Sequence, residues 1–143
     1  MSTFVRYAAV SSPPPFESLD FIYTPTADVD ATADWYVQVL GGHLDFKVRA
    51  MGTTVASITV ADAGPRILLA GHLHTPGPIL VYRVGDYAST IAALAVAGLH
   101  PTEQLEIPHG PCAAFEAEGG QAFAIYELVR PGAATYFDGR VDP

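Results

Sequence analysis

Residues 28–42 read DVDATADWYVQVLGG, and this stretch decides the fold of the 143-residue chain. Asp28 has the short side-chain acceptor that the N-terminus of a helix prefers. Gly41-Gly42 predicts the end of that helix, because glycine adopts the left-handed backbone of a helix C-terminus without strain. The apolar residues between these ends share one helix face, at spacings of i, i+4, i+7, i+8 and i+11. They are Val29, Ala33, Tyr36, Val37 and Leu40.

The same pattern returns 58 positions later, in residues 86–98, DYASTIAALAVAG. Asp86 stands at the place of Asp28 and predicts a second helix N-terminus. A repeat at a fixed offset indicates two copies of one structural unit. The apolar residues Tyr87, Ile91 and Leu94 correspond to Val29, Ala33 and Tyr36.

Each predicted helix follows one strand-like run and precedes three, and these runs are rich in apolar, β-branched and aromatic residues. They cover 19–26, 43–51, 53–60 and 65–71 in the first half, and 78–84, 102–108, 111–118 and 121–129 in the second. We therefore predict an α+β fold with a single domain over residues 1–143. It consists of two tandem βαβββ modules, 17–71 and 77–130, forming a curved sheet around a concave groove with the helices outside. Residues 1–16 and 131–143 are expected to be extended arms.

Alternation of side chains along the strands predicts which residues face the groove. A concave face is where a small molecule is expected to bind. The small side chains of Ala122 and Ala124 are expected to leave volume for it. The predicted ligand-binding residues are Phe21, Tyr23, Arg66, Leu68, Ile79, Val81, Arg83, Ala124 and Tyr126.

Composition excludes several classes of partner. The formal net charge is −8 with only seven Lys and Arg residues, which argues against binding to nucleic acid or to a strongly anionic membrane. No apolar run approaches the length of a membrane span. Cys112 is the single cysteine, so an internal disulfide is excluded and a reducing, cytoplasmic location is expected.

The run Asp28-Val29-Asp30 … Trp35-Tyr36 … Val39-Leu40-Gly41-Gly42 resembles the signature of the vicinal oxygen chelate superfamily. This group includes glyoxalase I, extradiol dioxygenases, fosfomycin-resistance enzymes and bleomycin-resistance proteins. The second half has a matching Val84-Gly85-Asp86, and residues 116–127 resemble the last hairpin of the family. The resemblance covers roughly residues 18–130 and implies the same fold as the repeat.

The resemblance also implies a divalent metal, held in the family's enzymes at one position on the first strand and one on the last strand of each module. In this sequence those positions are Phe21, Leu68, Ile79 and Ala124. None of these side chains has a lone pair to donate, whereas such metals need several converging N or O ligands. We therefore expect no metal and no cofactor. Metal-free members that resemble bleomycin-resistance proteins bind a compound in the same groove.

Other candidate residues have simpler interpretations. His72 and His74, with His109 and Glu127, could form a metal site elsewhere, but the flanking glycines and prolines favour a solvated loop. Cys112 after His109 suggests a Cys/His nucleophile, but a small apolar residue entering a strand after a tight His-Gly-Pro turn is the favoured interpretation, because a reactive thiol needs an electropositive setting.

Arg66 and Arg83 leave two functions open. Each could keep its charged head in water at the rim, or could fix a carboxylate, enolate or phenolate on an apolar ligand, with His72 and Tyr126 as polar neighbours. One hypothesis is a homodimeric binding protein for a small aromatic or polycyclic ligand, of the sequestration or resistance type. The other is a metal-independent isomerase, cyclase or lyase that uses Arg, His or Tyr side chains to stabilise an oxyanion.

Overall fold

The structure is a computed structural model that describes residues 15–50 and 52–143. Most of the predicted N-terminal arm, residues 1–14, lies outside the described residues. The element order repeats one unit twice, as the sequence predicts. The first module contains β1 (Phe16–Pro25), α1 (Val29–Leu40), β2 (His43–Ala50), β3 (Thr53–Thr59) and β4 (Arg66–Ala70). The second contains β5 (Ile79–Val84), α2 (Tyr87–Val96), β6 (Glu103–Ile107), β7 (Gly110–Glu116) and β8 (Ala122–Glu127), followed by the 3₁₀ turn η1 (Pro131–Ala134).

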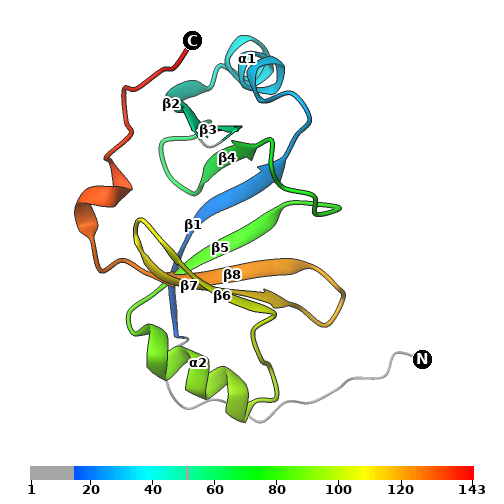
Figure 1. Ribbon diagram of the computed structural model, residues 1–143, viewed down its shortest axis with the longest axis vertical. Helices are drawn as coiled ribbons and strands as arrows, with labels where there is room; N and C mark the ends of the chain where they lie inside the picture. Colours follow the sequence, from blue (N-terminus) through cyan, green and yellow to red (C-terminus); the bar gives the residue numbers. More distant parts are fainter. Residues whose placement is uncertain (1–14, 51) are drawn as a thin grey trace.

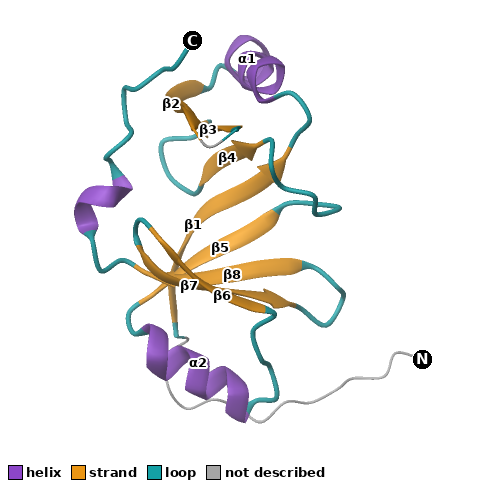
Figure 2. Ribbon diagram, in the orientation of Figure 1, coloured by secondary structure: helices purple, strands orange, loops and turns teal. Residues whose placement is uncertain are grey.

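The eight strands form one mixed sheet in the order β2-β3-β4-β1-β5-β8-β7-β6. The two modules join where β1 pairs antiparallel with β5. Within each module the first strand pairs parallel with the last, β1 with β4 and β5 with β8. Figures 1 and 2 show the sheet curving between the two helices, which lie at opposite ends of the molecule. The predicted α+β fold is confirmed.

Both helices begin and end as their sequences indicate. The Asp28 carboxylate accepts a hydrogen bond from the Ala31 amide at 3.0 Å, and Asp86 accepts one from the Ser89 amide at 2.8 Å. Gly41 ends α1 in the left-handed conformation, at φ 69°. Each helix packs on the outer face of its own module and forms a separate apolar core there. The first core contains Val29, Ala33, Ala56, Ile58 and Leu69; the second contains Val84, Ala113, Phe115 and Ile125 with the α2 residues Tyr87, Ile91 and Leu94.

The other face of the sheet is the concave face, and the strand register defines it. Phe21 lies opposite Arg66 on β4 and Val81 on β5. Residues paired in this way point to the same side of a sheet. A third apolar core lies on this side, and it contains Val81, Cys112, Ala124 and Tyr126 with Phe21, Tyr23 and Ile79 packed against them.

The C-terminal segment folds back onto the edge strand β2 of the same chain. The Gly139 amide donates to the Asp45 carbonyl, and the Lys47 amide donates to the Arg140 carbonyl, both at 2.8 Å. The ring of Phe137 packs on that of Phe46 at 5.7 Å. Figure 1 shows this segment running from the end of β8 towards α1. The sequence predicted an extended arm over residues 131–143, whereas this segment begins with the 3₁₀ turn η1 and then covers an edge of its own sheet.

Neither α1 nor α2, the two α-helices within the described ranges, is long and apolar enough to cross a membrane.

Candidate functional site

Three rings meet on the concave face around Phe21. The ring centroids of Phe21 and Tyr126 lie 5.9 Å apart, those of Phe21 and His109 5.7 Å apart, and those of His109 and Tyr126 5.5 Å apart. The tilted and edge-on arrangements are those that aromatic rings prefer. His109 comes from the turn between β6 and β7, which brings it over the face from the far edge of the sheet.

Asp20 joins this cluster because β1 has a register shift between Leu19 and Phe21. Strict alternation assigns Asp20 to the helix side, but a bulge turns its side chain to the concave face. The hydroxyl of Tyr126 donates a hydrogen bond to Asp20 Oδ2, and Ser18 Oγ donates to Oδ1 at 2.6 Å. Burial is the main reason why the pKa of Tyr126 is raised, and the bond to Asp20 adds to the effect.

Arg83 lies beside the same carboxylate. Its Nε is 3.5 Å from Asp20 Oδ2 and 3.7 Å from Glu17 Oε2, yet this buried nitrogen makes no hydrogen bond to any described residue. Arg83 is otherwise 36% exposed in its side chain. A buried donor without an acceptor is rare in folded proteins and calls for a partner.

His109 carries a second such atom, because its Nδ1 is also buried and without a partner among the described residues. Burial lowers the pKa of His109; nearby Asp20 opposes this shift and Arg130 adds to it. The imidazole is therefore neutral near neutral pH. Two buried nitrogens with unused hydrogen-bonding capacity thus border the three rings.

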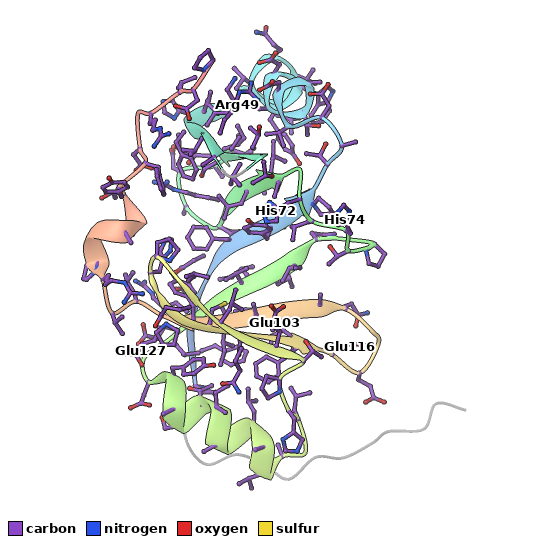
Figure 3. All side chains as sticks on the ribbon, in the orientation of Figure 1. Arg49, His72, His74, Glu103, Glu116 and Glu127 are labelled. Atoms are coloured by element: carbon purple, nitrogen blue, oxygen red, sulfur yellow. The ribbon has the colours of Figure 1, made fainter. Side chains whose placement is uncertain are left out.

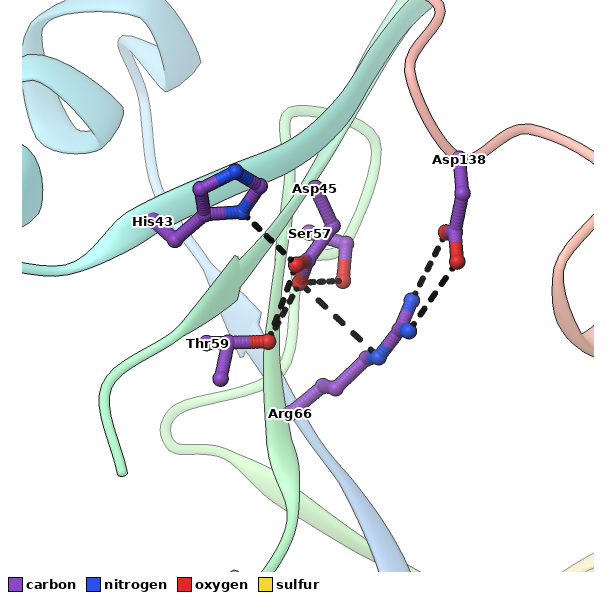
Figure 4. Close-up of polar contacts among 6 residues, drawn as sticks. All are labelled: His43, Asp45, Ser57, Thr59, Arg66 and Asp138. Carbon is purple, nitrogen blue, oxygen red and sulfur yellow. Dashed lines mark hydrogen bonds and ion pairs between the residues drawn. The ribbon is translucent and has the colours of Figure 1, made fainter. Parts of the chain in front are cut away.

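Arg66 also lies on the concave face, but its charged group is already bound. Nη1 and Nη2 donate to the two carboxylate oxygens of Asp138 at 2.8 and 3.1 Å. Its Nε lies 3.8 Å from Oδ2 of Asp45, a carboxylate that also accepts hydrogen bonds from Ser57 and Thr59. Figure 4 shows this cluster, with Arg66 between the two carboxylates. The hydrogen bond to Asp138 is the main reason why the pKa of Arg66 is raised.

The predicted ligand-binding residues differ in how deeply they are buried. Val81, Ala124 and Tyr126 are buried, with 8%, 6% and 2% of their surface exposed. They form the floor under Phe21 and His109, and solvent barely reaches the Ala124 side chain. The half-buried residues form the accessible part of the face: Phe21, Tyr23, Arg66, Leu68, Ile79 and Arg83.

The predicted polar neighbour His72 lies away from the Phe21 cluster. Its Nδ1 is 3.1 Å from Thr53 Oγ1, and its ring meets that of Tyr23 edge-on, with the ring centroids 6.2 Å apart. Figure 3 shows His72 and His74 together in the connection between β4 and β5. Only the other predicted neighbour, Tyr126, lies beside Arg83, where the two are paired across β5 and β8.

A divalent metal does not fit the residues at the four strand positions. Phe21, Leu68, Ile79 and Ala124 lie on the concave face and offer only carbon atoms. Within residues 15–50 and 52–143, no three His, Cys, Asp or Glu side chains come together as a metal site would require. The thiol of Cys112 is buried, and burial raises its pKa to about 11, which opposes a nucleophilic role.

A separate cavity of about 350 Å³ lies at the start of α1, away from the Phe21 cluster. Its polar residues bind one another: Arg49 donates to the carboxylate of Asp30 at 2.6 Å and to the hydroxyl of Thr54 at 2.9 Å. The guanidinium of Arg49 therefore already has hydrogen-bond partners within the protein.

Comparison with known proteins agrees with this architecture. A family model described as "Glyoxalase/Bleomycin resistance protein/Dioxygenase superfamily" matches residues 18–125. Methylmalonyl-CoA epimerase from Mycobacterium tuberculosis is similar in structure, with a TM-score of 0.69 and 20% identity over 90% of this chain and 97% of that one. A second methylmalonyl-CoA epimerase gives 0.67 and 14% identity over 83% and 100%. A hypothetical protein from Bacillus halodurans C-125 gives 0.65 and 17% identity over 77% and 93%. The search of curated proteins gave no match. At these identities the structural likeness shows a shared fold.

Proposed function

Because this chain belongs to the glyoxalase/bleomycin resistance protein/dioxygenase superfamily, we propose that it binds a small aromatic or polycyclic molecule on its concave face without a metal. The observation that supports this most is the pair of buried, unpartnered nitrogens, Arg83 Nε and His109 Nδ1, around the Phe21 ring. Buried polar groups are normally satisfied, so these two atoms favour a ligand with an acceptor at this place. Its role is sequestration or resistance.

The chemistry of the face defines the ligand. A flat ring stacked on Phe21 or Tyr23 gains about 0.5–1.5 kcal/mol beyond the area that it buries. An anionic edge that accepts a hydrogen bond from Arg83 adds about 1.5–3 kcal/mol. Asp20 and Glu17 lie at 3.5 and 3.7 Å from Arg83 Nε, where they attract the guanidinium without using its donor. The ligand's acceptor therefore completes this arrangement.

A second candidate function is a metal-independent isomerase, cyclase or lyase. Neutral His109 beside the hydrogen-bonded pair of Tyr126 and Asp20 favours it, because a neutral imidazole is a suitable proton acceptor. Two of the similar structures named above are methylmalonyl-CoA epimerases, which is consistent with this candidate. Arg83 would then hold the oxyanion that forms. Turnover that is lost in Arg83→Leu separates this function from simple binding.

The test of the binding function uses two matched fluorescent probes, 2-naphthoate and the neutral 2-naphthalenemethanol, with affinity read by calorimetry. Trp35 is 49% exposed on α1, which packs on the outer face of the sheet, so its fluorescence reports poorly on the concave face. Arg83→Leu should weaken 2-naphthoate about tenfold or more and leave the neutral probe unchanged. Arg49→Leu, which removes an arginine outside the face, serves as the control. Equal loss of affinity in both variants, or no binding of either probe, would contradict the proposal.

A further inference from the structure

Arg66 has the geometry of a carboxylate-binding fork. It begins β4 directly opposite Phe21 of β1, on the concave face. Its two terminal nitrogens each contact one oxygen of Asp138, at 2.8 and 3.1 Å. This parallel two-point contact is how an arginine recognises a carboxylate of any origin. The carboxylate found there belongs to the chain's own C-terminal segment (Figure 4).

The fork is supported from behind, independently of Asp138. Asp45 lies at a register shift between Leu44 and Phe46 and is 8% exposed. It accepts a hydrogen bond from Ser57 at 3.0 Å and from Thr59 at 2.8 Å. Its Oδ2 lies 3.8 Å from Arg66 Nε. Because Asp45 keeps these partners, the guanidinium remains aimed at the face when Asp138 leaves.

Asp138 itself is accessible to competition. The side chains of Arg66 and Asp138 are 30% and 33% exposed, so solutes reach the pair, and a partly exposed ion pair contributes little to stability. The neighbouring backbone bonds from Gly139 and Arg140 to β2 do not depend on the Asp138 carboxylate. The carboxylate can therefore separate from Arg66 while the segment stays on β2.

We infer that Arg66 is a second carboxylate subsite of the concave face, and that Asp138 occupies it as an internal competitor of the ligand. This inference rests on the proposed binding function. Arg66 and Arg83 stand on the two strands that flank β1, Arg66 opposite Phe21 and Arg83 opposite Ser18. The face then suits a flat aromatic molecule with a carboxylate at each end, one for each arginine, once Asp138 is displaced.

The test compares 2,6-naphthalenedicarboxylate with 2-naphthoate by calorimetry. Asp138→Asn should raise the affinity for the dicarboxylate about tenfold and change that for 2-naphthoate less than about threefold. Adding Arg66→Leu to Asp138→Asn should remove the gain. Asp34→Asn, an exposed carboxylate on α1, is the matched control and should behave as wild type.

The outcomes separate this inference from the proposed function. If Arg83→Leu weakens 2-naphthoate but Asp138→Asn leaves the dicarboxylate within about twofold of wild type, the competitor role of Asp138 is wrong and the binding function stands. If neither probe binds any variant, both are wrong. If Asp138→Asn folds poorly, an NMR measurement on the wild-type protein still tests the inference. Saturating dicarboxylate should shift the amide resonances of Asp138 and Gly139, and unshifted resonances with bound probe would overturn the inference.

Discussion

The hydroxyl of Tyr126 on β8 donates a hydrogen bond to the carboxylate of Asp20 on β1, although β5 lies between these two strands. The bond therefore passes over Arg83, which pairs with Tyr126 across β5 and β8. It links the two modules on the concave face and holds Asp20 within 3.5 Å of Arg83. Removing this bond should lower the stability of the protein and loosen the position of the Asp20 carboxylate beside Arg83.

Tyr126→Phe should therefore destabilise the protein by about 1.5–3 kcal/mol, the usual value for a hydrogen bond to a charged group. The urea midpoint measures this loss. Tyr136→Phe is the control, because Tyr136 is 76% exposed. Because the pKa of Tyr126 is raised, the folded protein holds the Tyr126 proton above about pH 10, where the unfolded chain releases it. Stability should fall as the pH rises above this value, and less steeply in Tyr126→Phe. Equal urea midpoints for both variants would contradict the role of this bond.

Acid should also destabilise the protein through His109. Its folded pKa is lowered by burial, so between that value and about pH 6.5 the unfolded chain binds more protons than the folded one. Stability is therefore full above about pH 6.5 and decreases as the pH falls towards the folded pKa. The charged groups that act on the ring are Asp20 and Arg130. An NMR titration of the imidazole should give a midpoint below about 6.5, and His109→Gln should flatten the acid limb of the urea midpoint. A midpoint above the usual histidine value would show that the attraction of Asp20 exceeds the burial effect.

The strands and their faces could be predicted because a repeat fixes the element order and alternation fixes the faces. Phe21, Val81 and Ala124 lie on the predicted side for this reason. Asp20 and Asp45 could not be predicted, since each sits at a register shift that interrupts the alternation. Nothing in the local sequence marks such a bulge when no glycine accompanies it.

The places of His109 and Asp138 on the concave face could not be predicted for another reason, because both residues reach this face through tertiary contacts. A Cβ on Gly110 would lie 2.2 Å from the Glu127 carbonyl oxygen, so this glycine lets the turn carrying His109 pack closely against the end of β8. The His-Gly-Pro run indicated a tight turn but not what the turn contacts. Asp138 meets Arg66 across 72 residues of sequence, and no local pattern reports that pairing.

We expect no stoichiometric divalent metal in the purified protein. Phe21, Leu68, Ile79 and Ala124 supply no donor atoms at the four strand positions where the resemblance implies metal ligands. Elemental analysis after mild purification measures this directly. About one Zn, Fe, Mn or Ni per chain, bound by these strands, would contradict the prediction.

A homodimer is the expected assembly. The C-terminal segment covers the β2 edge, whereas β6 is the other outer strand of the sheet and has no partner beyond it among the described residues. Trp35, Val39 and Leu40 expose 49%, 60% and 47% of their surface on α1. Proteins tend to cover such edges and apolar surfaces by symmetric association. Light scattering at micromolar concentration should give twice the chain mass; a monomer mass would refute the prediction.

Ala124 provides the sharpest test of where the ligand space lies. The sequence led us to expect room beside this small residue, so that Ala124→Trp would fill the pocket and spare the fold. The structure instead leaves Ala124 6% exposed, between Val81 and Ala114 in the sheet. A tryptophan there should overpack the core and destabilise the protein by about 1–3 kcal/mol.

Ala122→Trp is the matched control for this change, because Ala122 belongs to the same strand and face but is half-buried at its start. Thermal unfolding should show a lower Tm for Ala124→Trp and a nearly unchanged Tm for Ala122→Trp. If Ala124→Trp keeps the wild-type Tm but loses binding of 2-naphthoate, the side chain has entered a real pocket. The ligand would then lie over the Ala124 floor, below the Phe21 ring, and contacts to Phe21 and Tyr23 would be only the rim of the site.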